Sequence, residues 1–426
     1  MQVIILAGGK GTRLLKFTKK PKIFARFGNI ILIDLYLDIF KQFNTKNINF
    51  ILGNKSEQII EHLKKFLFNG KIHVEKKPLG TAGALENFNT HTSKDLLVIM
   101  GDVLTNFNAK KFLKFHKEKN ADISLFVHPN NHPYDSDLID LGKNDRVIKF
   151  YSKDRKKINI SDNLATAGIY LLKTKVLKLL KKNTKQDLSK DLIIKAIKKN
   201  KKVFAYKSAE YVKDIGTPER YFQALNDIKN KKFSVSSKNK KNVAIFMDRD
   251  GVINKEKKNY QYSNPCDLYP GVIDAIKGIN QSSYLAIIIS NQPSIAKGFV
   301  SKDYVDYTHK KLQTELGLKN VYLNDIFYCP HHPDKGFKNE MIKYKIKCKC
   351  RKPRPGLILE AKKKYNIELS KSYFLGNSRA DYLAAKSANV NAVVINNKEL
   401  TREISQKKNF SSLKDFTKFF FKKKKI

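Results

Sequence analysis

Two aspartates, Asp248 and Asp250, stand one residue apart directly after the apolar run Val243–Phe246. Such a run predicts a buried strand. At a strand end, one carboxylate of the pair can attack phosphorus while the other passes a proton to the leaving group. An Asp-x-Asp pair is also common in turns, so the pair indicates phosphate chemistry only in the company of other suitable groups.

Three further segments of the same half carry such groups. Ser290 and Asn291 follow another apolar run and offer a hydroxyl and an amide to phosphate oxygens. Lys352 offers a positive charge, and Asn377 also follows an apolar run. Because ligands bind beyond the carboxyl ends of the strands in open α/β sheets, we expect these groups to gather around the aspartate pair.

Three of the four cysteines cluster around a histidine, in Cys-Pro-His and Cys-Lys-Cys. In a reducing compartment this pattern favours metal over disulfides. Three thiolates and one imidazole complete a tetrahedral structural zinc site, with the ligands expected at Cys329, His331, Cys348 and Cys350. His332 is the alternative nitrogen ligand, and Cys266 is expected to be a plain small residue.

A glycine-rich turn follows the first apolar run of the chain. It consists of Leu6, Ala7, Gly8, Gly9, Lys10, Gly11, Thr12 and Arg13. Glycines let backbone N–H groups approach phosphates closely, and Lys10 and Arg13 can neutralise a triphosphate. An ordinary strand-to-helix turn has the same composition, so the turn alone is a weak signal.

Two carboxylates accompany this turn. Asp102 follows an apolar run, and Asp214 stands in Asp-Ile-Gly-Thr-Pro, before a turn and a helix. Either one alone is typical of a turn or cap, but together they match the one or two carboxylates that Mg²⁺ takes beside substrate phosphates. Lys22 and a second small-residue loop with Gly80 and Thr81 complete the set.

The elements that must position these groups alternate between strands and helices. Residues 34–42 and 56–66 have apolar side chains at helical spacing. In the first half, strands are expected at Val3–Leu6, Asn49–Leu52, Leu96–Met100 and Ile123–His128. This alternation predicts an α/β domain with a largely parallel sheet.

A second α/β domain follows a change in composition. Residues 229–242 are rich in Lys, Asn and Ser and predict a linker between domains at 1–228 and 243–397. Later strands are expected at 243–246, 285–289, 326–328, 373–375 and 392–395. Both domains are thus expected to be Rossmann-like, three-layer α/β units. The basic tail, 398–426, is expected to end in a packed helical turn, with contact to an anionic membrane as the alternative.

The N-terminal set resembles that of the sugar-1-phosphate nucleotidyltransferases, over about residues 1–228. The resemblance implies a glycosyltransferase-A-like sheet on which the glycine-rich turn, including Arg13, wraps the nucleotide phosphates. It further implies that Gly80 and Thr81 lie near the base and that Lys22 holds the phosphate under attack.

The same resemblance implies that Asp102 and Asp214 hold Mg²⁺ and that the strand containing Gly168 faces the sugar. A sugar-1-phosphate oxygen would then attack the α-phosphorus of a nucleoside triphosphate, and pyrophosphate would leave. The family often has a glutamate in the sugar pocket where this chain has Ser189.

The C-terminal segments resemble the four motifs of the haloacid-dehalogenase-superfamily phosphatases. The resemblance implies that Asp248 becomes the aspartyl-phosphate and that Asp250 is the general acid and then the base. The phosphoryl group is expected at Ser290, Asn291 and Lys352, and Mg²⁺ at Asp248, Asp250 and Asn377.

Position 377 departs from the superfamily pattern, which has aspartate there. Asn377 is a neutral and weaker ligand for a hard cation, and Asp381 is the carboxylate that would replace it, directly or through water.

The zinc loop runs into Cys-Arg-Lys-Pro, which resembles the D-glycero-D-manno-heptose-1,7-bisphosphate phosphatases and the related histidinol phosphatases. This likeness covers about residues 243–397. It implies that the loop covers the active site and that Arg351 faces the second phosphate of the substrate.

The charge balance is strongly positive, with 84 Lys and Arg against 39 Asp and Glu, a net charge of +45. The excess is mostly lysine spread along the chain, beside abundant Asn, Ile and Phe. This distribution indicates compositional bias rather than a nucleic-acid-binding stripe, so no nucleic-acid partner is expected. A positive field also attracts phosphorylated substrates.

The sequence shows neither a basic leader with a cleavage site nor an apolar run near the roughly 18 residues of a membrane span. We therefore expect a cytoplasmic protein without stable membrane insertion. An oligomer is compatible with the sequence.

The two halves fit consecutive steps of one pathway. A phosphatase would convert heptose 1,7-bisphosphate to heptose 1-phosphate, and a nucleotidyltransferase would then make a nucleotide-activated heptose for surface polysaccharide or lipopolysaccharide. GTP is favoured, because the first half looks most like the guanylyltransferases that act on heptose 1-phosphate. One alternative is a mannose- or glucose-1-phosphate nucleotidyltransferase fused to a phosphatase for another substrate, such as histidinol phosphate. Others are a catalytically weakened C-terminal scaffold and a basic nucleic-acid-binding protein.

Overall fold

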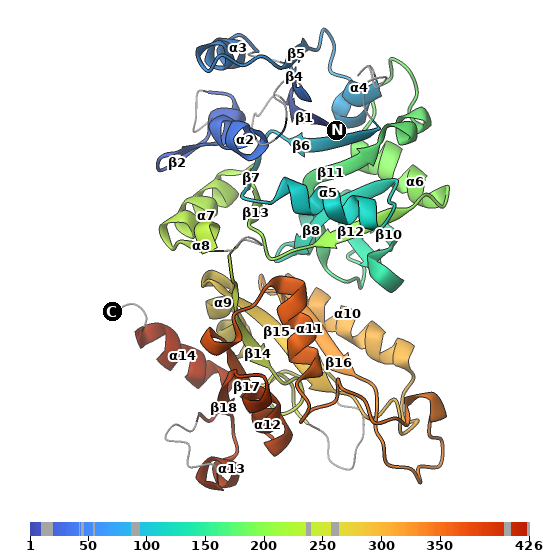
Figure 1. The fold of residues 1–426 in the computed structure, drawn as a ribbon, viewed down its shortest axis with the longest axis vertical. Helices are drawn as coiled ribbons and strands as arrows, with labels where there is room; N and C mark the ends of the chain where they lie inside the picture. Colours follow the sequence, from blue (N-terminus) through green and yellow to red (C-terminus); the bar gives the residue numbers. More distant parts are fainter. Residues whose placement is uncertain are drawn as a thin grey trace. The chain divides into compact units, whose positions relative to one another are not determined.

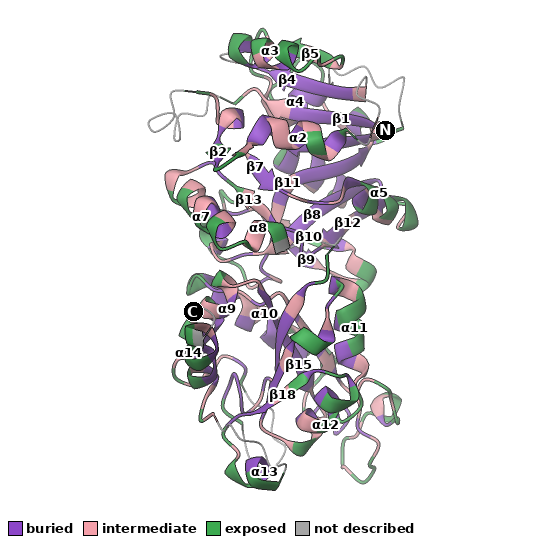
Figure 2. Cartoon of the chain, turned by 60° about the vertical axis from the view of Figure 1, so that its left-hand side comes forward, coloured by how far each residue is buried: buried purple, intermediate pink, exposed green. Residues whose placement is uncertain are grey.

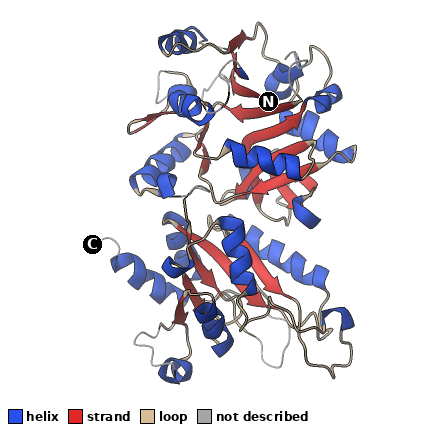
Figure 3. Cartoon of the chain, viewed as in Figure 1, coloured by secondary structure: helices blue, strands red, loops and turns tan. Residues whose placement is uncertain are grey.

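The computed structural model describes residues 1–9, 20–41, 43, 47–53, 56–86, 94–235, 240–256, 264–403 and 410–423. The chain divides into two compact units. The first comprises Met1–His128, Ser136–Arg155 and Leu164–Ser237, and the second comprises Pro129–Asp135, Lys156–Asn163 and Lys238–Ile426. Each unit is an α/β structure, as predicted, with helices packed around its own main sheet (Figures 1 and 3).

Nine strands form the main sheet of the first unit, with β10-β9-β11-β6-β1-β4-β5 in order and β8 pairing with β11 and β12. They are β1 Gln2–Ala7, β4 Ile48–Leu52, β5 Lys71–Val74, β6 Asp95–Met100, β8 Ile123–Pro129, β9 Leu138–Leu141, β10 Val147–Tyr151, β11 Leu164–Lys173 and β12 Val203–Lys207. Strand β1 runs parallel to β4 and β6, whereas β11 runs antiparallel to β6. The sheet is therefore mixed, where a largely parallel one was predicted.

Two small strand pairs complete the first unit, β2 Arg26–Phe27 with β3 Ile30–Ile31, and β7 Val103–Thr105 with β13 Val212–Asp214. The helices are α2 Leu32–Phe40, α3 Ser56–Lys65, α4 Gly80–Glu86, α5 Ala109–Glu118, α6 Ile194–Lys198, α7 Pro218–Lys229, α8 Lys232–Val235 and the short helices η1 Lys22–Phe24 and η6 Leu188–Ile193.

Each face of this sheet has its own apolar core. Helices α2, α3 and α5 pack on one face, where Tyr36, Phe40 and Phe112 are fully buried. Helices α4, η6 and α6 pack on the other face, through Leu85 and Leu192 among others. Figure 2 shows the central strands β1, β4 and β6 as buried, with exposed residues on the helices and on the edge strand β5.

The main sheet of the second unit has five parallel strands in the order β16-β15-β14-β17-β18. They are β14 Val243–Met247, β15 Tyr284–Asn291, β16 Asp325–Cys329, β17 Tyr373–Gly376 and β18 Asn391–Val394. The helices are α9 Val272–Gln281, α10 Lys302–Leu318, α11 Gly356–Tyr365, α12 Arg379–Ser387, α13 Lys398–Glu403 and α14 Leu413–Lys423. One face of the sheet carries α9, α10 and α14, and α11 and α12 pack on the other.

Every expected strand is present, within one or two residues of the predicted bounds. The expected linker differs, because α8 lies inside it and Phe233 packs against Tyr211 at 5.4 Å. The tail is more ordered than a final helical turn, since Phe416 and Phe420 of α14 are buried in the core beside α9. Among the described residues no helix combines the length and the apolarity needed to cross a membrane.

Two candidate active sites and a candidate zinc site

The two carboxylates predicted to hold magnesium in the first unit lie on adjacent backbone segments, at the turn before β7 and at the end of its partner strand β13. Asp102 follows β6, and Asp214 ends β13 opposite Val103. The backbone N–H of Ile215 donates to Asp102 O at 2.9 Å, which fixes the two chain segments side by side. The fold thus brings together residues that are far apart in the sequence.

Lys22 of η1 reaches the same place and donates to Asp102 Oδ2 at 3.1 Å. Burial raises the pKa of Asp102, the Asp214 carboxylate raises it further, and Lys22 lowers it. Arg220 pairs with Asp214 in turn. Two neighbouring carboxylates are an oxygen donor set whose negative charge a divalent cation neutralises, so these residues fit Mg²⁺.

The glycine-rich turn begins at this same sheet edge. Leu6 and Ala7 end β1, and Gly101 N–H donates to Leu6 O at 2.8 Å. Gly8 and Gly9 follow directly. The remaining predicted residues of the turn lie outside the described part of the chain: Lys10, Gly11, Thr12 and Arg13.

The second small-residue loop begins α4. Gly80 has φ +74°, and a Cβ there would lie 2.5 Å from Gln186 O, so only glycine fits. Thr81 Oγ1 donates to Asp187 Oδ2 at 3.3 Å and accepts from Leu188 N–H at 2.8 Å. The loop is therefore attached to η6.

Gly168 lies within β11, at the sheet edge that carries Asp102. Its φ is +71°, and a Cβ would lie 3.0 Å from the Val103 side chain. Ser189, which replaces the glutamate of the family pattern, is buried and donates to Asp137 Oδ2 at 2.7 Å.

Lys352 is the centre of the second unit's site and is 3% exposed. Its Nζ lies 2.9 Å from Asp248 Oδ1 and 2.6 Å from Asp381 Oδ1, and it donates to Ile289 O at 2.9 Å. The other oxygen of Asp381 accepts the N–H and the hydroxyl of Ser378, the cap of α12. Asp381 therefore serves here as the counter-ion of Lys352.

The charges of this buried group are coupled. Burial and the Asp381 carboxylate raise the pKa of Asp248 to about 8, although Lys352 opposes the shift. Burial favours neutral Lys352, but Asp248 and Asp381 outweigh it and raise its pKa. Asp248 would therefore hold a proton near neutral pH without metal, and a divalent cation would favour the ionised form.

Asp250 belongs to a second buried network. Its Oδ2 accepts from Gln292 Nε2 at 2.8 Å and from Arg249 at 3.0 Å. Arg249 is fully buried and also contacts Gln292 Oε1 and His309 Nε2, both at 2.9 Å. Burial and Arg249 lower the pKa of His309 well below its usual value, so His309 is a neutral acceptor. The network fixes the orientation of the proposed acid–base carboxylate.

Ser290 and Asn291 lie at the end of β15, as predicted. Ser290 is fully buried, and its Oγ accepts from Gln292 Nε2 at 2.8 Å. Asn291 exchanges two hydrogen bonds of 3.0 Å with the backbone of Lys352. These two bonds hold the end of β15, which carries Ser290, beside the backbone segment that carries Lys352.

Asn377 lies beside Gly251, where a Cβ would come within 2.0 Å of its Nδ2. Gly251 has φ +82°, so glycine is required on both grounds. The Asn377 amide nitrogen donates to Glu256 Oε2 at 3.4 Å, and the amide oxygen is the atom that would ligate a cation. Asp248, the Asp250 carbonyl and this amide oxygen are all hard donors and fit Mg²⁺.

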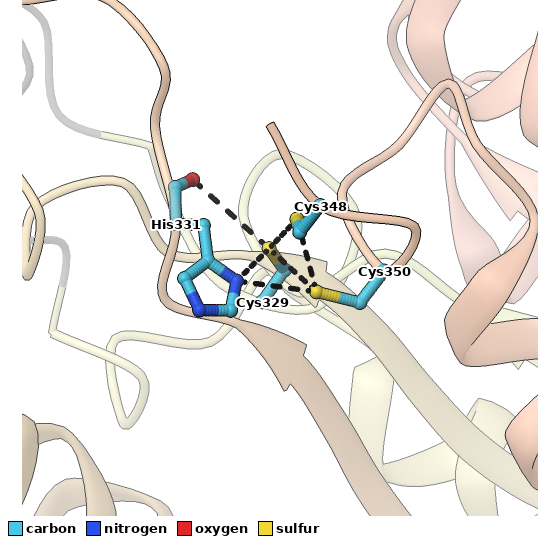
Figure 4. A group of neighbouring side chains, drawn as sticks. All are labelled: Cys329, His331, Cys348 and Cys350. Carbon is cyan, nitrogen blue, oxygen red and sulfur yellow. Dashed lines mark hydrogen bonds between the residues drawn. The ribbon is translucent and has the colours of Figure 1, made fainter. Parts of the chain in front are cut away.

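The four predicted zinc ligands converge at the end of β16 (Figure 4). Their ligand atoms lie within 4.8 Å of one another. Cys350 Sγ is 3.1 Å from Cys329 Sγ and 3.2 Å from Cys348 Sγ, and His331 Nδ1 is 3.3 Å from Cys350 Sγ. A tetrahedral zinc with Zn–S bonds of about 2.3 Å needs S–S separations of about 3.8 Å, so this donor set fits with a slight expansion.

The thiols of this cluster differ in their acidity. Burial and Cys350 raise the pKa of Cys329, whereas hydrogen bonds from Cys350 and Cys329 outweigh burial and lower the pKa of Cys348. A bound metal would displace the protons that the thiols still hold. His332 is separate, because its Nε2 lies 3.7 Å from Asp334. Arg351 donates to His331 O at 3.3 Å beside the cluster.

Sequence reasoning missed three functional contacts: Arg249 with His309, Asp381 with Lys352, and Ser189 with Asp137. The position of Arg249 between two motif aspartates, directly after a predicted strand, could have indicated that Arg249 is buried in the site. His309 gave none, because it lies in a polar stretch of α10 and its partner is 60 residues away.

Comparison with known proteins divides the chain in the same way. Residues 2–231 match the family described as nucleotidyl transferase, and residues 242–413 match the family described as polynucleotide kinase 3 phosphatase. Two solved structures resemble the first part: a putative glucose-1-phosphate thymidylyltransferase from Bacillus anthracis (TM-score 0.47, 23% identity, covering 53% of this chain and 94% of that one) and HddC from Yersinia pseudotuberculosis (0.44, 22%, 53% and 99%).

The second part is similar to curated phosphatases. It is 34% identical over 147 residues to the D-glycero-beta-D-manno-heptose-1,7-bisphosphate 7-phosphatase of Rhodopseudomonas palustris, covering 34% of this chain and 79% of the relative. It is 39% identical over 151 residues to the D-glycero-alpha-D-manno-heptose-1,7-bisphosphate 7-phosphatase of Photorhabdus laumondii, covering 34% and 77%.

The matched residues 2–231 make up more than half of the chain. With a nucleotidyl transferase domain followed by a phosphatase domain, the chain is an enzyme that belongs to the nucleotidyl transferase family and, in its second part, to the family of the heptose-1,7-bisphosphate 7-phosphatases.

Proposed function

We propose that this enzyme removes the C7 phosphate of D-glycero-D-manno-heptose 1,7-bisphosphate and then transfers a nucleotidyl group, GMP from GTP, to the resulting heptose 1-phosphate. One observation carries the proposal: relatives of the second part are named for a 7-phosphatase reaction that leaves a sugar 1-phosphate. A sugar 1-phosphate is the acceptor that a fused nucleotidyltransferase of this type requires.

In the phosphatase step, Asp248 attacks the C7 phosphorus and forms an aspartyl-phosphate, while Asp250 gives a proton to the departing sugar oxygen. Water, deprotonated by Asp250, then hydrolyses the aspartyl-phosphate and releases inorganic phosphate. Lys352, 2.9 Å from Asp248, neutralises the negative charge that gathers on the phosphoryl oxygens. Mg²⁺ at Asp248, Asp250 and Asn377 would add further positive charge.

In the transferase step, an oxygen of heptose 1-phosphate attacks the α-phosphorus of the triphosphate, and pyrophosphate leaves. This reaction needs no covalent enzyme intermediate. Lys22 holds the phosphate, and Asp102 and Asp214 are the residues that would hold Mg²⁺. The preference for GTP rests on the sequence resemblance to guanylyltransferases.

A phosphorus NMR time course tests the proposal. The purified protein is incubated with Mg²⁺, an equal mixture of four nucleoside triphosphates and either anomer of the heptose bisphosphate. We expect inorganic phosphate first and a nucleotide-diphosphate sugar afterwards, with GTP consumed. An intact bisphosphate in both tubes would contradict the phosphatase step, and heptose 1-phosphate added to the same tubes would test the transferase step separately.

A further inference from the structure

Asp137 lies on the same sheet edge as the metal-binding carboxylates of the first unit. Thr166 N–H of β11 donates to Asp137 O at 3.2 Å. The antiparallel register pairs Ile169 of β11 with Ile99 of β6. Strands β9, β11 and β6 are consecutive in the sheet, so Asp137, before β9, and Asp102, after β6, lie at the same sheet edge on either side of β11.

Asp137 also faces the side of the sheet that carries α4 and η6. Ile139 of β9 packs into the core on that side, and side chains alternate along a strand, so Asp137 shares its face. Ser189 of η6 reaches Asp137 directly at 2.7 Å. The buried Tyr170 lies close enough for the Asp137 charge to raise its pKa, after the larger effect of burial.

The Asp137 carboxylate is half-buried and fixed in orientation. Lys153 N–H donates to Oδ1 at 2.7 Å, and Ser189 Oγ donates to Oδ2 at 2.7 Å. Each carboxylate oxygen has two lone pairs, so these bonds leave one acceptor position on each oxygen. Two neighbouring acceptors on a fixed anion are suited to a pair of hydroxyl donors.

The loop expected near the nucleotide base is bonded to η6, the same helix that holds Asp137. Thr81, expected near the base, is bonded to Asp187 and Leu188 at the start of η6. Asp187 Oδ1 in turn accepts the N–H of Ser189 at 2.9 Å. Asp137 is thus placed relative to both the nucleotide loop and the metal-binding carboxylates.

We propose that Asp137 is the sugar-recognition residue of the nucleotidyl transfer site. Its carboxylate accepts hydrogen bonds from two neighbouring hydroxyls on the side of the sugar ring away from the phosphate. Ser189 is a positioning residue that holds this carboxylate. The inference rests on the proposed transferase function and names its acceptor class: a pyranose 1-phosphate with a free diol at that position.

The test uses the full chain, with heptose 1-phosphate, mannose 1-phosphate and a set of monodeoxy mannose 1-phosphates as probes. Affinity for each sugar phosphate is measured by calorimetry, and KM is measured for both substrates. We expect Asp137→Asn to weaken sugar-phosphate binding about 10- to 100-fold, with KM for the triphosphate unchanged. Ser189→Ala should weaken it about 3- to 10-fold. Asp145→Asn is the control, because Asp145 follows β9 in the chain, is 36% exposed and pairs with Lys119 rather than with η6.

The deoxy sugars separate hydroxyl recognition from a structural effect. The wild-type protein should discriminate against the analogue that lacks a contacted hydroxyl, and Asp137→Asn should not. Equal sugar affinity in wild type and Asp137→Asn, or an equal rise in both KM values, would overturn the inference. If the wild type binds sugar phosphates without turnover, the proposed function fails. The ratio of sugar-phosphate affinities between wild type and Asp137→Asn still decides the role of Asp137. If it binds none, both are overturned.

Discussion

The two active sites differ in how much of their chemistry the protein itself supplies. In the phosphatase site, Lys352 already bridges Asp248 and Asp381, and Arg249 holds Asp250. In the transferase site, Asp102 pairs with Lys22 and Asp214 pairs with Arg220, and the proposed reaction uses no protein nucleophile. Covalent catalysis needs a prearranged nucleophile, whereas in-line transfer needs charge and placement that the substrates and ions complete.

The largest effect should come from removing the proposed nucleophile, Asp248. Asp248→Asn is expected to lower phosphate release by on the order of 10³-fold or more, because no other group can form the aspartyl-phosphate. Nucleotidyl transfer from heptose 1-phosphate should be unchanged. Initial rates of both half-reactions check this, with Asp274→Asn as an exposed control in the same unit. Loss of both activities in Asp248→Asn would contradict the assignment of the two reactions to separate sites.

Removing a proposed magnesium ligand from the transferase site should lower activity by a smaller factor. Asp102→Asn is expected to slow nucleotidyl transfer about 100- to 1000-fold and to raise the Mg²⁺ concentration needed, because half of the carboxylate pair is gone. Phosphate release should not change. A magnesium titration of pyrophosphate release measures it, with the exposed Asp38→Asn as the control. An unaltered magnesium dependence would remove Asp102 from the metal site.

Loss of the proposed zinc site should destabilise the phosphatase unit and leave the stability of the first unit unchanged. Cys348→Ser is expected to abolish zinc binding and to lower the unfolding temperature of the phosphatase unit by about 5–10 °C, because the ion closes the loop after β16. Cys266→Ser, away from the cluster, is the control. Elemental analysis and calorimetry report both quantities, and full zinc retention in Cys348→Ser would contradict the assignment.

The smallest effect concerns acid stability. His116 is 1% exposed, its Nδ1 lies 2.7 Å from Ser124 Oγ, and burial lowers its pKa to about 4. The ordinary pKa of histidine is about 6.5, so the unfolded chain takes up the proton first as pH falls. The stabilisation is complete above about pH 6.5 and is lost toward pH 4, about 2 kcal/mol of it by pH 5.

Denaturant unfolding at pH 7 and pH 5 measures this loss. His116→Gln carries no titrating group, so its stability should fall less between the two pH values. An equal fall would show that the His116 imidazole is not the cause. The pKa of the buried His309 in the phosphatase unit is also lowered, so His309 also destabilises the protein as the pH falls. The contribution of His116 is therefore the difference in pH-dependent stability between the wild type and His116→Gln.

Local patterns predicted the strands and the motif residues at their ends, because apolar runs and the groups that follow them are contiguous in sequence. Strand direction was not predictable in this way: β11 has the same apolar character as β1 but pairs antiparallel with β6. The contact between Ser189 and Asp137 spans 52 residues and arises only when η6 packs on β9 and β11. Side-chain networks of this kind depend on tertiary packing rather than on any local pattern.

The tail shows the same limit of local patterns. Phe416 and Phe420 looked like a short turn before lysines, yet α14 completes the core beside α9. Their burial depends on the apolar surface that α9 and the sheet provide together, which the tail sequence alone does not contain.

Mixing the two single variants tests the central claim, that one chain holds two independent sites joined by a shared intermediate. Asp248→Asn and Asp102→Asn are each incubated with heptose bisphosphate, GTP and Mg²⁺, alone and together. We predict that neither variant alone forms the nucleotide-diphosphate sugar and that the mixture does, since heptose 1-phosphate made by one is used by the other. A product formed by Asp248→Asn alone, or a mixture that stays inactive although each variant keeps its remaining half-reaction, would contradict the account.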